Sequence, residues 1–400
     1  MTRTTAENST KSSDGDDPPA SGKPLEATLT GPIAGLAAAA WDGLCPDDNP
    51  FVRHAFLAAL EDSGSAAAES GWQPLHLLIG DPSSPRAAAP LYVKSHSYGE
   101  YVFDHGWANA YERAGGAYYP KLLVGVPFTP VPGPRLLGRD EVGKRALAEA
   151  LLAVAERLEL SSVHVNFIDE NDSRVLEEAG FMRREGVQFH WHNRGYRDFA
   201  DFLAAMRSSK RKSVKKERGE VQRAGLEIKT LSGSDLTVAD LEAFYPFYRA
   251  TVNKRWGNAY LRRDFFIQLA TTFADRIVLV TVRSEGMLVA AALNLKSGDT
   301  LYGRLWGCRS EFDFLHFEAC YYRAIEYAIE NGMARVEAGA QGMHKLQRGY
   351  EPVITRSAHF ICDPGLREPV RRFLLQEQRS VAQEMQQLVE LLPFHRVHQD

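Results

Sequence analysis

Apolar residues between positions 141 and 159 recur at the spacing of an α-helix. Leu147, Leu151, Val154 and Leu158 are three or four residues apart, and charged residues occupy the other face. The segment therefore predicts an amphipathic helix at 141–159. Apolar runs and a glycine stop predict three further elements: a strand at 163–167, a short helix at 173–179 and a strand at 181–192.

The same order of elements returns near the C-terminal end of the chain. It consists of a helix at 315–331, a strand at 334–338, a short helix at 341–348 and a strand at 353–361. The order repeats while the residues differ, which indicates a duplicated domain. We therefore predict an N-terminal domain at 27–194 and a C-terminal domain at 195–400. Residues 1–26 hold almost nothing to bury, so we expect a disordered leader there.

The remaining apolar patterns complete the two halves. They predict a helix at 51–60, a hairpin of 75–80 with 87–94, helices at 199–206, 241–255 and 261–273, a meander of 277–282, 288–295 and 300–306, and a final helix from 366. Pro246 should kink or divide its helix, because proline lacks a backbone donor. Aromatic residues gather between Tyr98 and Tyr119, and this pattern fits either core packing or a ligand-facing wall.

Composition narrows the class of protein. The 400 residues suit two domains, and 44% apolar with 24% charged residues is typical of a globular protein. The apolar runs are too short for a membrane span, and the N-terminus has no secretory apolar core. The four cysteines lack CxxC spacing, so we predict free thiols and a cytoplasmic location.

One local segment departs from the small net charge of −4. Residues 207–223 hold eight Lys and Arg residues against two Glu, and only Val214 and Val221 offer an apolar seam. A solvated surface helix and a phosphate-binding face both fit this pattern. On the second reading, the phosphate-binding residues are Lys210, Arg211 and Lys215.

Polar residues collect at the strand ends of the second half, where ligands bind on α/β sheets. They are Arg304, Trp306, His316, Glu318, Tyr322, Glu337, Gln341, His344, Lys345 and Arg348. Zinc chemistry has little support, because no Pro-Cys-x-x-Cys follows His316-Phe-Glu318, and we predict no metal. Gly-x-Gly-x-x-Gly, Gly-Lys-Ser/Thr and Gly-x-Ser-x-Gly motifs are also lacking.

Acyl transfer without a covalent intermediate fits this set of residues. The reaction needs a proton acceptor for an amine and positive charge for a developing oxyanion. Lys345 and Arg348, three residues apart, can offer charge to an anion. Glu337 or His344 could accept the proton, and His316 near the start of its helix is a further candidate. We therefore treat these five residues as catalytic candidates and the other polar residues as substrate-binding ones.

Several blocks of sequence resemble a known family. The order meander, helix, strand, short helix and strand resembles the GNAT N-acyltransferase fold, and its duplication resembles the FemAB branch. The blocks are Tyr98-Gly-Glu-Tyr-Val-Phe-Asp, Tyr119-Pro-Lys-Leu-Leu, the proline-rich 126–136, Lys254-Arg-Trp-Gly, Leu315-His-Phe-Glu-Ala-Cys-Tyr-Tyr and 339–350. They resemble a bacterial family of FemAB-like N-acyltransferases. The resemblance implies the α/β (α+β) class, with two tandem GNAT-like domains that each hold a mixed, mainly antiparallel sheet flanked by helices.

The resemblance also implies a function and a place for it. It suggests an N-acyltransferase that joins an acyl or aminoacyl group to an amine acceptor, with a small molecule or cell-wall precursor as the substrate. Direct attack would occur in a cleft between the domains. Lys345 and Arg348 resemble the segment that uses a lysine against substrate phosphates, and we expect the opposite wall at Trp107, Tyr119, Lys121 and Thr129.

The acyl donor stays open between acyl-CoA and aminoacyl-tRNA. Residues 309–314 lack the glycines of the acetyl-CoA pyrophosphate loop, and no inserted arm for tRNA is present. The competing hypothesis is a non-catalytic module that binds phosphate-rich ligands or RNA through residues 207–223.

Overall fold

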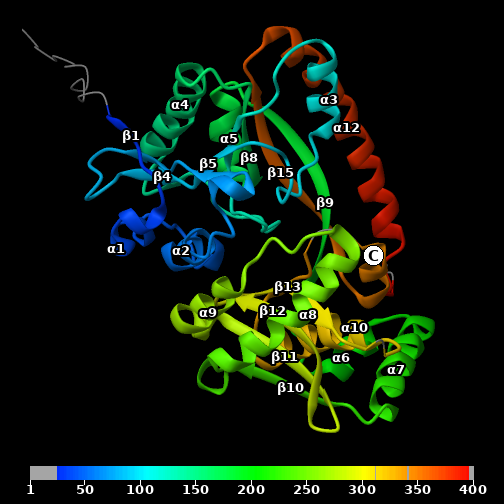
Figure 1. Cartoon of the computed structure of the whole chain (residues 1–400). Helices are drawn as coiled ribbons and strands as arrows, with labels where there is room; N and C mark the ends of the chain where they lie inside the picture. The colour runs from blue at the N-terminus through cyan, green and yellow to red at the C-terminus, as the bar shows by residue number, and fades with distance from the viewer. Residues whose placement is uncertain (1–24, 311, 340–341, 396–400) are drawn as a thin grey trace, which may run out of the picture.

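The computed structural model describes residues 25–310, 312–339 and 342–395 (Figure 1). Most of the predicted leader and Gln341 therefore lie outside the described residues. The strands are β1 (Ala27–Leu29), β2 (Trp72–Pro74), β3 (Leu77–Ile79), β4 (Ala87–Ala89), β5 (Leu91–Lys94), β6 (Lys121–Val124), β7 (Leu137–Gly138), β8 (Ser162–Ile168), β9 (Met182–His192), β10 (Glu227–Ser232), β11 (Ile277–Ser284), β12 (Met287–Lys296), β13 (Thr300–Cys308), β14 (Arg335–Glu337) and β15 (Glu351–Ile361).

The α-helices are α1 (Ala38–Asp42), α2 (His54–Asp62), α3 (His105–Arg113), α4 (Glu141–Arg157), α5 (Glu170–Glu178), α6 (Phe199–Ala205), α7 (Ser208–Arg223), α8 (Val238–Trp256), α9 (Arg263–Thr272), α10 (Leu315–Phe317), α11 (Arg323–Glu330) and α12 (Pro364–Glu390). A π-helical turn at Glu318–Tyr322 joins α10 to α11, and Met343–Arg348 forms a 3-10 helix.

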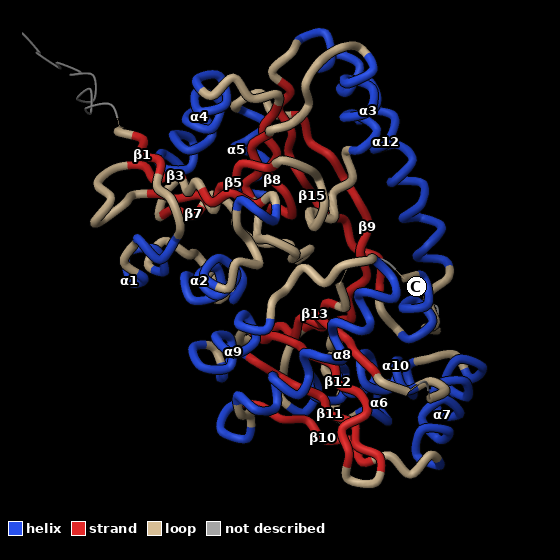
Figure 2. Tube along the Cα trace, viewed as in Figure 1, coloured by secondary structure: helices blue, strands red, loops and turns tan. Residues whose placement is uncertain are grey.

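One large sheet runs through both halves of the chain (Figure 2). Its strand order is β10-β11-β12-β13-β14-β9-β15-β8-β6-β5-β2. Neighbouring strands are antiparallel except for the β13·β14 and β6·β8 pairs, which are parallel. A small second sheet has the order β1-β3-β4-β7.

The two halves exchange their last strands within the large sheet. β9 ends the first half but lies between β14 and β15, and β15 ends the second half but lies between β9 and β8. Figure 1 shows β9 running from the upper lobe toward the lower one. Hydrogen bonding therefore continues across the chain division at Arg194, and the domain limits 27–194 and 195–400 stay a prediction.

Strand alternation places different layers on the two faces of the second half. Leu301 packs with Ile325 and Val336 beneath α11, whereas its neighbour Tyr302 joins the core beneath α8. The core beneath α8 is shared by both halves of the chain, because the ring centres of Phe51 and Tyr302 are 5.1 Å apart. The junction between the halves is thus a packed interior.

Local chemistry explains where many helices begin. The Asp140 side chain accepts a hydrogen bond from the Gly143 backbone at the start of α4, and Asp169 does the same for Asp172 at α5. Thr237 and Asp240 form a capping box at α8. Each cap satisfies an amide that has no partner within the helix.

Most predicted elements are confirmed, with three corrections. The predicted strand at 87–94 is divided at Pro90, so that β4 enters the small sheet and β5 the large one. The helix α8 runs through Pro246 without division. The predicted helix at 341–348 is described from Met343 and is a 3-10 helix.

Candidate active site at the junction of the halves

Glu337 and His190 face each other on adjacent antiparallel strands from opposite halves of the chain. Glu337 Oε2 lies 3.9 Å from His190 Nε2, and the residues are 5% and 8% exposed. Oε2 has no hydrogen-bond partner among the described residues. Burial raises the pKa of Glu337 to about 7, and burial lowers the pKa of His190 to about 3. The imidazole is therefore neutral at pH 7, and the carboxyl group can exchange a proton there.

Arg304 brings a positive charge to this pair from β13. Its Nη2 donates to the backbone oxygen of Phe128 at 2.7 Å, and its guanidinium carbon lies 5.3 Å from the centre of the Phe51 ring. Burial has the largest effect on the pKa of Glu337, and the positive charges of Arg335 and Arg304 lower this pKa. Arg304 and Thr129 line one narrow, largely apolar cleft. The structure thus brings these two predicted residues together from opposite halves.

Lys345 is buried beside the end of β14. It is 2% exposed, and its ammonium donates to the backbone oxygen of Gly339 at 2.8 Å. Burial lowers the pKa of Lys345 to about 8. Burial has the largest effect on the pKa of His190, and the charges of Arg335, His192 and Lys345 lower it further. Lys345 therefore contributes to the same electrostatic environment as the Glu337–His190 pair.

Arg348 is held in place by a carboxylate on the basic helix. Its Nη2 lies 2.9 Å from each oxygen of Glu217, and Nη1 donates to the His344 backbone at 2.8 Å. The guanidinium carbon lies 3.4 Å from the centre of the Phe317 ring, and Tyr322 also donates to Glu217. The charge of Arg348 is compensated within the protein, which favours a positioning role over direct catalysis.

The predicted histidines belong to an aromatic cluster beside Lys345. The Tyr321 hydroxyl and His344 Nε2 are 2.9 Å apart. The His316 ring lies 5.5 Å from Trp306 and 6.3 Å from His344, center to center. The π turn at Glu318–Tyr322 places Tyr321 toward His344, and such turns are frequent at functional sites.

Glu318 has a different environment from the one predicted for a substrate-binding residue. Arg218 donates to both of its oxygens at 3.0 Å, and Arg323 donates to Oε1 at 2.9 Å. Both carboxylate oxygens are therefore engaged with cations of α7 and α11. These ion pairs link α7 to α11, and the substrate-binding role of Glu318 stays a prediction.

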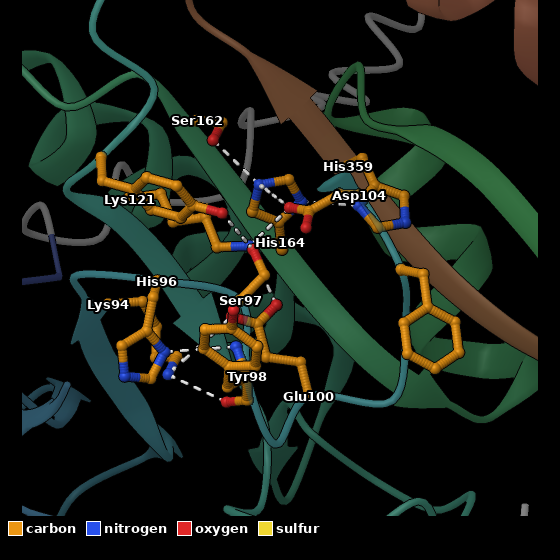
Figure 3. Close-up of polar contacts among 12 residues, drawn as sticks. Lys94, His96, Ser97, Tyr98, Glu100, Asp104, Lys121, Ser162, His164 and His359 are labelled. Atoms are coloured by element: carbon orange, nitrogen blue, oxygen red, sulfur yellow. Dashed lines mark hydrogen bonds and ion pairs between the residues drawn. The ribbon is translucent and has the colours of Figure 1, made fainter. Parts of the chain in front are cut away.

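Of the residues predicted for the opposite wall, Trp107 and Lys121 are buried in the upper lobe, and Tyr119 is half-buried there. The Lys121 ammonium is 0% exposed and donates to Ser97 at 2.8 Å, Glu100 at 2.9 Å and Asp104 at 2.5 Å. Figure 3 shows these contacts. The Tyr119 hydroxyl bonds to Ser97, and Trp107 packs on His359. Their described contacts hold this lobe together, and their role as a wall opposite Lys345 stays a prediction.

Charge and burial compete inside this network. Burial lowers the pKa of Lys121, but the adjacent Glu100 and Asp104 carboxylates outweigh it and leave the pKa raised. Burial raises the pKa of Glu100 to about 7, against the effect of Lys121. Burial also favours the neutral form of Asp104, yet Lys121 and His164 hold the pKa of Asp104 well below its usual range.

The basic helix α7 packs through its predicted apolar seam. Val214 and Val221 are buried, while Lys215 is exposed. Lys210 donates to Gln347 at 2.9 Å, and Arg211 donates to the Ala204 backbone at 3.4 Å. The phosphate-binding role of Lys210, Arg211 and Lys215 stays a prediction.

Sequence reasoning missed His190 and Glu217 as site residues. His190 is one of two alternate histidines on its strand, a pattern typical of ordinary strand residues. Glu217 is one of two glutamates in a basic segment, and its partners Tyr322 and Arg348 are far away in the sequence. No local pattern marks either one.

Neither a metal nor a membrane span is indicated by the part of the chain that the structure describes. Its His, Cys, Asp and Glu residues form no group of three or more that could hold a metal ion. None of its helices has the length and apolar character needed to cross a membrane.

Comparison with solved structures defines the fold. The crystal structure of FemX aligns with a TM-score of 0.51 and 13% identity over 85% of this chain and 98% of FemX. The C-terminal domain of a putative lysylphosphatidylglycerol synthetase from Agrobacterium fabrum aligns with a TM-score of 0.51 and 10% identity, over 82% and 92% of the two chains. These identities establish likeness of fold alone. The predicted α/β (α+β) class, with a mixed and mainly antiparallel sheet flanked by helices, is confirmed.

The sequence also identifies the family. It matches the FemAB-like family, described as peptidoglycan biosynthesis/recognition, over residues 32–396. The chain belongs to the FemAB-like family. This membership supports the predicted enzyme class, an acyltransferase. No curated protein matches the sequence.

Proposed function

We propose that this chain transfers an acyl or aminoacyl group to an amine of a peptidoglycan precursor, with the reaction at the Glu337–His190 pair. The observation that carries the proposal is the buried carboxyl group of Glu337, whose pKa is raised to about 7 and whose Oε2 has no partner among the described residues. Such a group can accept a proton at neutral pH. The family's link to peptidoglycan supports the choice of acceptor.

The proposed step is direct attack of the acceptor amine on the donor carbonyl carbon. The new C–N bond forms as the ester or thioester bond of the donor breaks. Glu337 takes the proton that the amine loses, and the departing alcohol or thiol takes up a proton. The Lys345 ammonium and the Arg304 guanidinium offset the negative charge that develops on the carbonyl oxygen.

The acyl donor and the cellular location of the protein are two separate questions. An aminoacyl ester of tRNA and an acyl thioester of CoA both contain a carbonyl that the same step can use. We retain both donors in the proposal, and the cytoplasmic location stays a prediction. Direct attack requires both substrates to be bound together, so a shielded junction between the halves suits the reaction.

Mass spectrometry of the acceptor tests the proposal. The full chain is incubated with acyl-CoAs or aminoacyl-tRNAs and a peptidoglycan-precursor peptide that carries a free amine. We expect an acceptor mass increase from one donor class, and a loss of about 10²–10⁴-fold in rate for Glu337→Gln. Glu368→Gln is the matched control, because Glu368 is an exposed carboxylate on α12. A Glu337→Gln protein that transfers at the wild-type rate would overturn the assignment of the base.

The competing RNA-binding hypothesis predicts a different result. The exposed cations of α7, including Lys215, would bind RNA with an affinity that falls steeply as salt rises. Absence of acyl transfer from every donor, together with such binding, would favour that hypothesis.

A further inference from the structure

The segment at residues 96–105 presents a row of aromatic rings at the protein surface. Ring centres are 5.2 Å apart for His96 and Tyr98, 5.9 Å for Tyr98 and His105, and 6.5 Å for Phe103 and His105. Tyr98 is 71% exposed and Phe103 is 56% exposed. We call His96, Tyr98, Phe103 and His105 the aromatic platform. Contiguous exposed apolar surface of this kind often marks a binding site.

Buried contacts hold the backbone of the platform in place. Ser97, Glu100 and Asp104 lie between the rings in sequence and all bind the Lys121 ammonium inside the lobe (Figure 3). Lys94 donates to the Tyr98 backbone oxygen at 3.4 Å. The segment is therefore ordered before a ligand arrives, which lowers the entropic cost of binding.

The platform borders a groove that leads toward the candidate active site. Tyr101, Val102 and Phe103 form one side of this groove, which has a volume of about 280 Å³. Other lining residues come from β8, β9, β15 and α12, and include Gln188. Gln188 Oε1 lies 3.4 Å from His190 Nε2. A ligand on the rings could thus extend toward the Glu337–His190 pair.

Both arginines of the groove are paired with carboxylates of the protein. Arg184 donates to both oxygens of Glu377 at 2.8 Å and to the Phe103 backbone oxygen at 2.8 Å. Arg356 lies 2.6 Å from Glu170. The lining includes two arginines and three glutamates, so it lacks the positive excess that a nucleic-acid backbone requires. Thr355, Ser357 and Gln188 give the lining an uncharged polar character, although Ser357 Oγ lies 2.8 Å from His359 Nε2 and Gln188 donates to the Pro130 backbone oxygen at 2.9 Å. Such a lining suits an uncharged polar ligand better than an anion.

We propose that the aromatic platform binds an uncharged sugar ring of the acceptor, such as an N-acetylated amino sugar. The C–H groups on one face of a pyranose ring are attracted to the negative face of an aromatic ring, while its hydroxyl and acetamido groups reach the polar groove. The inference rests on the proposed function for its link to the acceptor, because a sugar held there places an attached peptide along the groove toward Glu337.

Sugar binding is measured without any acyl donor, so that the test is independent of catalysis. The probe is chitotetraose, an uncharged oligomer of N-acetylglucosamine, titrated into the full chain by calorimetry. We expect binding that weakens about tenfold or more in Tyr98→Ala/Phe103→Ala. Met287→Ala is the control, because Met287 is a 65% exposed apolar residue on β12 in the other lobe.

The outcomes separate this proposal from the proposed function. Wild-type chitotetraose affinity in Glu337→Gln, which should lose acyl transfer, would support sugar binding as a separate step. Sugar binding that depends on the rings in a chain without transferase activity would support the platform and contradict the proposed function. No binding by the wild-type chain, or equal binding by the double variant, would overturn the platform. Ring-dependent binding of a single-stranded RNA oligonucleotide in place of the sugar would overturn the choice of ligand.

Discussion

Glu337 and His190 lie side by side because the two halves of the chain exchange strands. His190 is on β9 from the first half, Glu337 is on β14 from the second half, and 3.9 Å separates Oε2 from Nε2. The same burial disfavours charge on both groups. His190 is therefore neutral at pH 7, whereas Glu337 is partly ionised there and can accept a proton in its carboxylate form.

The pH dependence of turnover should follow Glu337 and Lys345. As a base, Glu337 must lose its proton, so kcat/KM should rise as pH increases through about 7. Lys345 must keep its proton to offer charge, so kcat/KM should fall as pH increases through about 8. Rate profiles of the wild type and Glu337→Gln test this. Retention of the acidic limb in Glu337→Gln would contradict the assignment.

The same carboxyl group should affect stability in a defined direction. Its pKa is raised in the folded state from 4.5 to about 7, so the folded state holds the proton more tightly. That contribution is fully present below about pH 4.5 and is lost as pH rises through about 7. Denaturant unfolding should therefore show that Glu337→Gln gains stability relative to the wild type between pH 5 and pH 8. A constant difference would argue against the raised pKa.

Removing the Lys345 ammonium should slow transfer more than it weakens the fold. Lys345→Ala should lower kcat by about 10²–10³-fold if its charge stabilises the developing oxyanion. Lys229→Ala on β10, where the lysine side chain is 64% exposed, provides the control. Steady-state kinetics and thermal unfolding are measured on both proteins. A wild-type kcat in Lys345→Ala would remove this residue from the proposed site.

Glu217 and Arg348 should be energetically coupled, because their side chains form a largely buried ion pair at 2.9 Å. Each single variant, Glu217→Gln or Arg348→Met, leaves its partner without a counter-charge. The double variant should therefore lose less stability than the sum of the two, with a coupling of about 1–3 kcal/mol. Denaturant unfolding of all four proteins gives this value. Additive losses would show that the pair contributes no mutual stabilisation.

The Lys121 network should depend strongly on its cation. Lys121→Met leaves Glu100 and Asp104 buried without the ammonium and should cost about 3–5 kcal/mol of stability. Without that cation, burial raises both carboxyl pKa values, so Lys121→Met should regain stability as pH falls. Lys121→Met/Glu100→Gln/Asp104→Asn should recover much of the loss at pH 8. Equal unfolding free energies for the wild type and Lys121→Met would contradict the ion-cluster account.

The order of elements could be predicted from sequence because it depends on local periodicity and helix caps. Leu147, Leu151 and Val154 mark the buried face of α4 without any knowledge of its partner. The exchange of β9 and β15 could not be predicted in this way, since an apolar alternation indicates a strand but not its neighbours. The division of β4 from β5 at Pro90 has a local cause and could have been predicted.

The candidate site was predictable only in part for the same reason. Glu337 is the last residue of a strand and Lys345 follows that strand, and this local position indicated a ligand-binding edge. Lys121 had no local mark of burial, because its two carboxylate partners come from a loop whose path is set by tertiary packing. The environment of Glu318 likewise depends on arginines of two separate helices.

The exchanged strands also constrain how a newly made chain can mature. A ribosome delivers β8 and β9 well before β14 and β15, so their neighbouring edges have no native partner during most of synthesis. Open strand edges are prone to pairing with the wrong chain. The sheet of the first half therefore cannot be completed until the strands near the C-terminus have been made. A truncation near the C-terminus should thus disrupt the first half of the chain as well as the second.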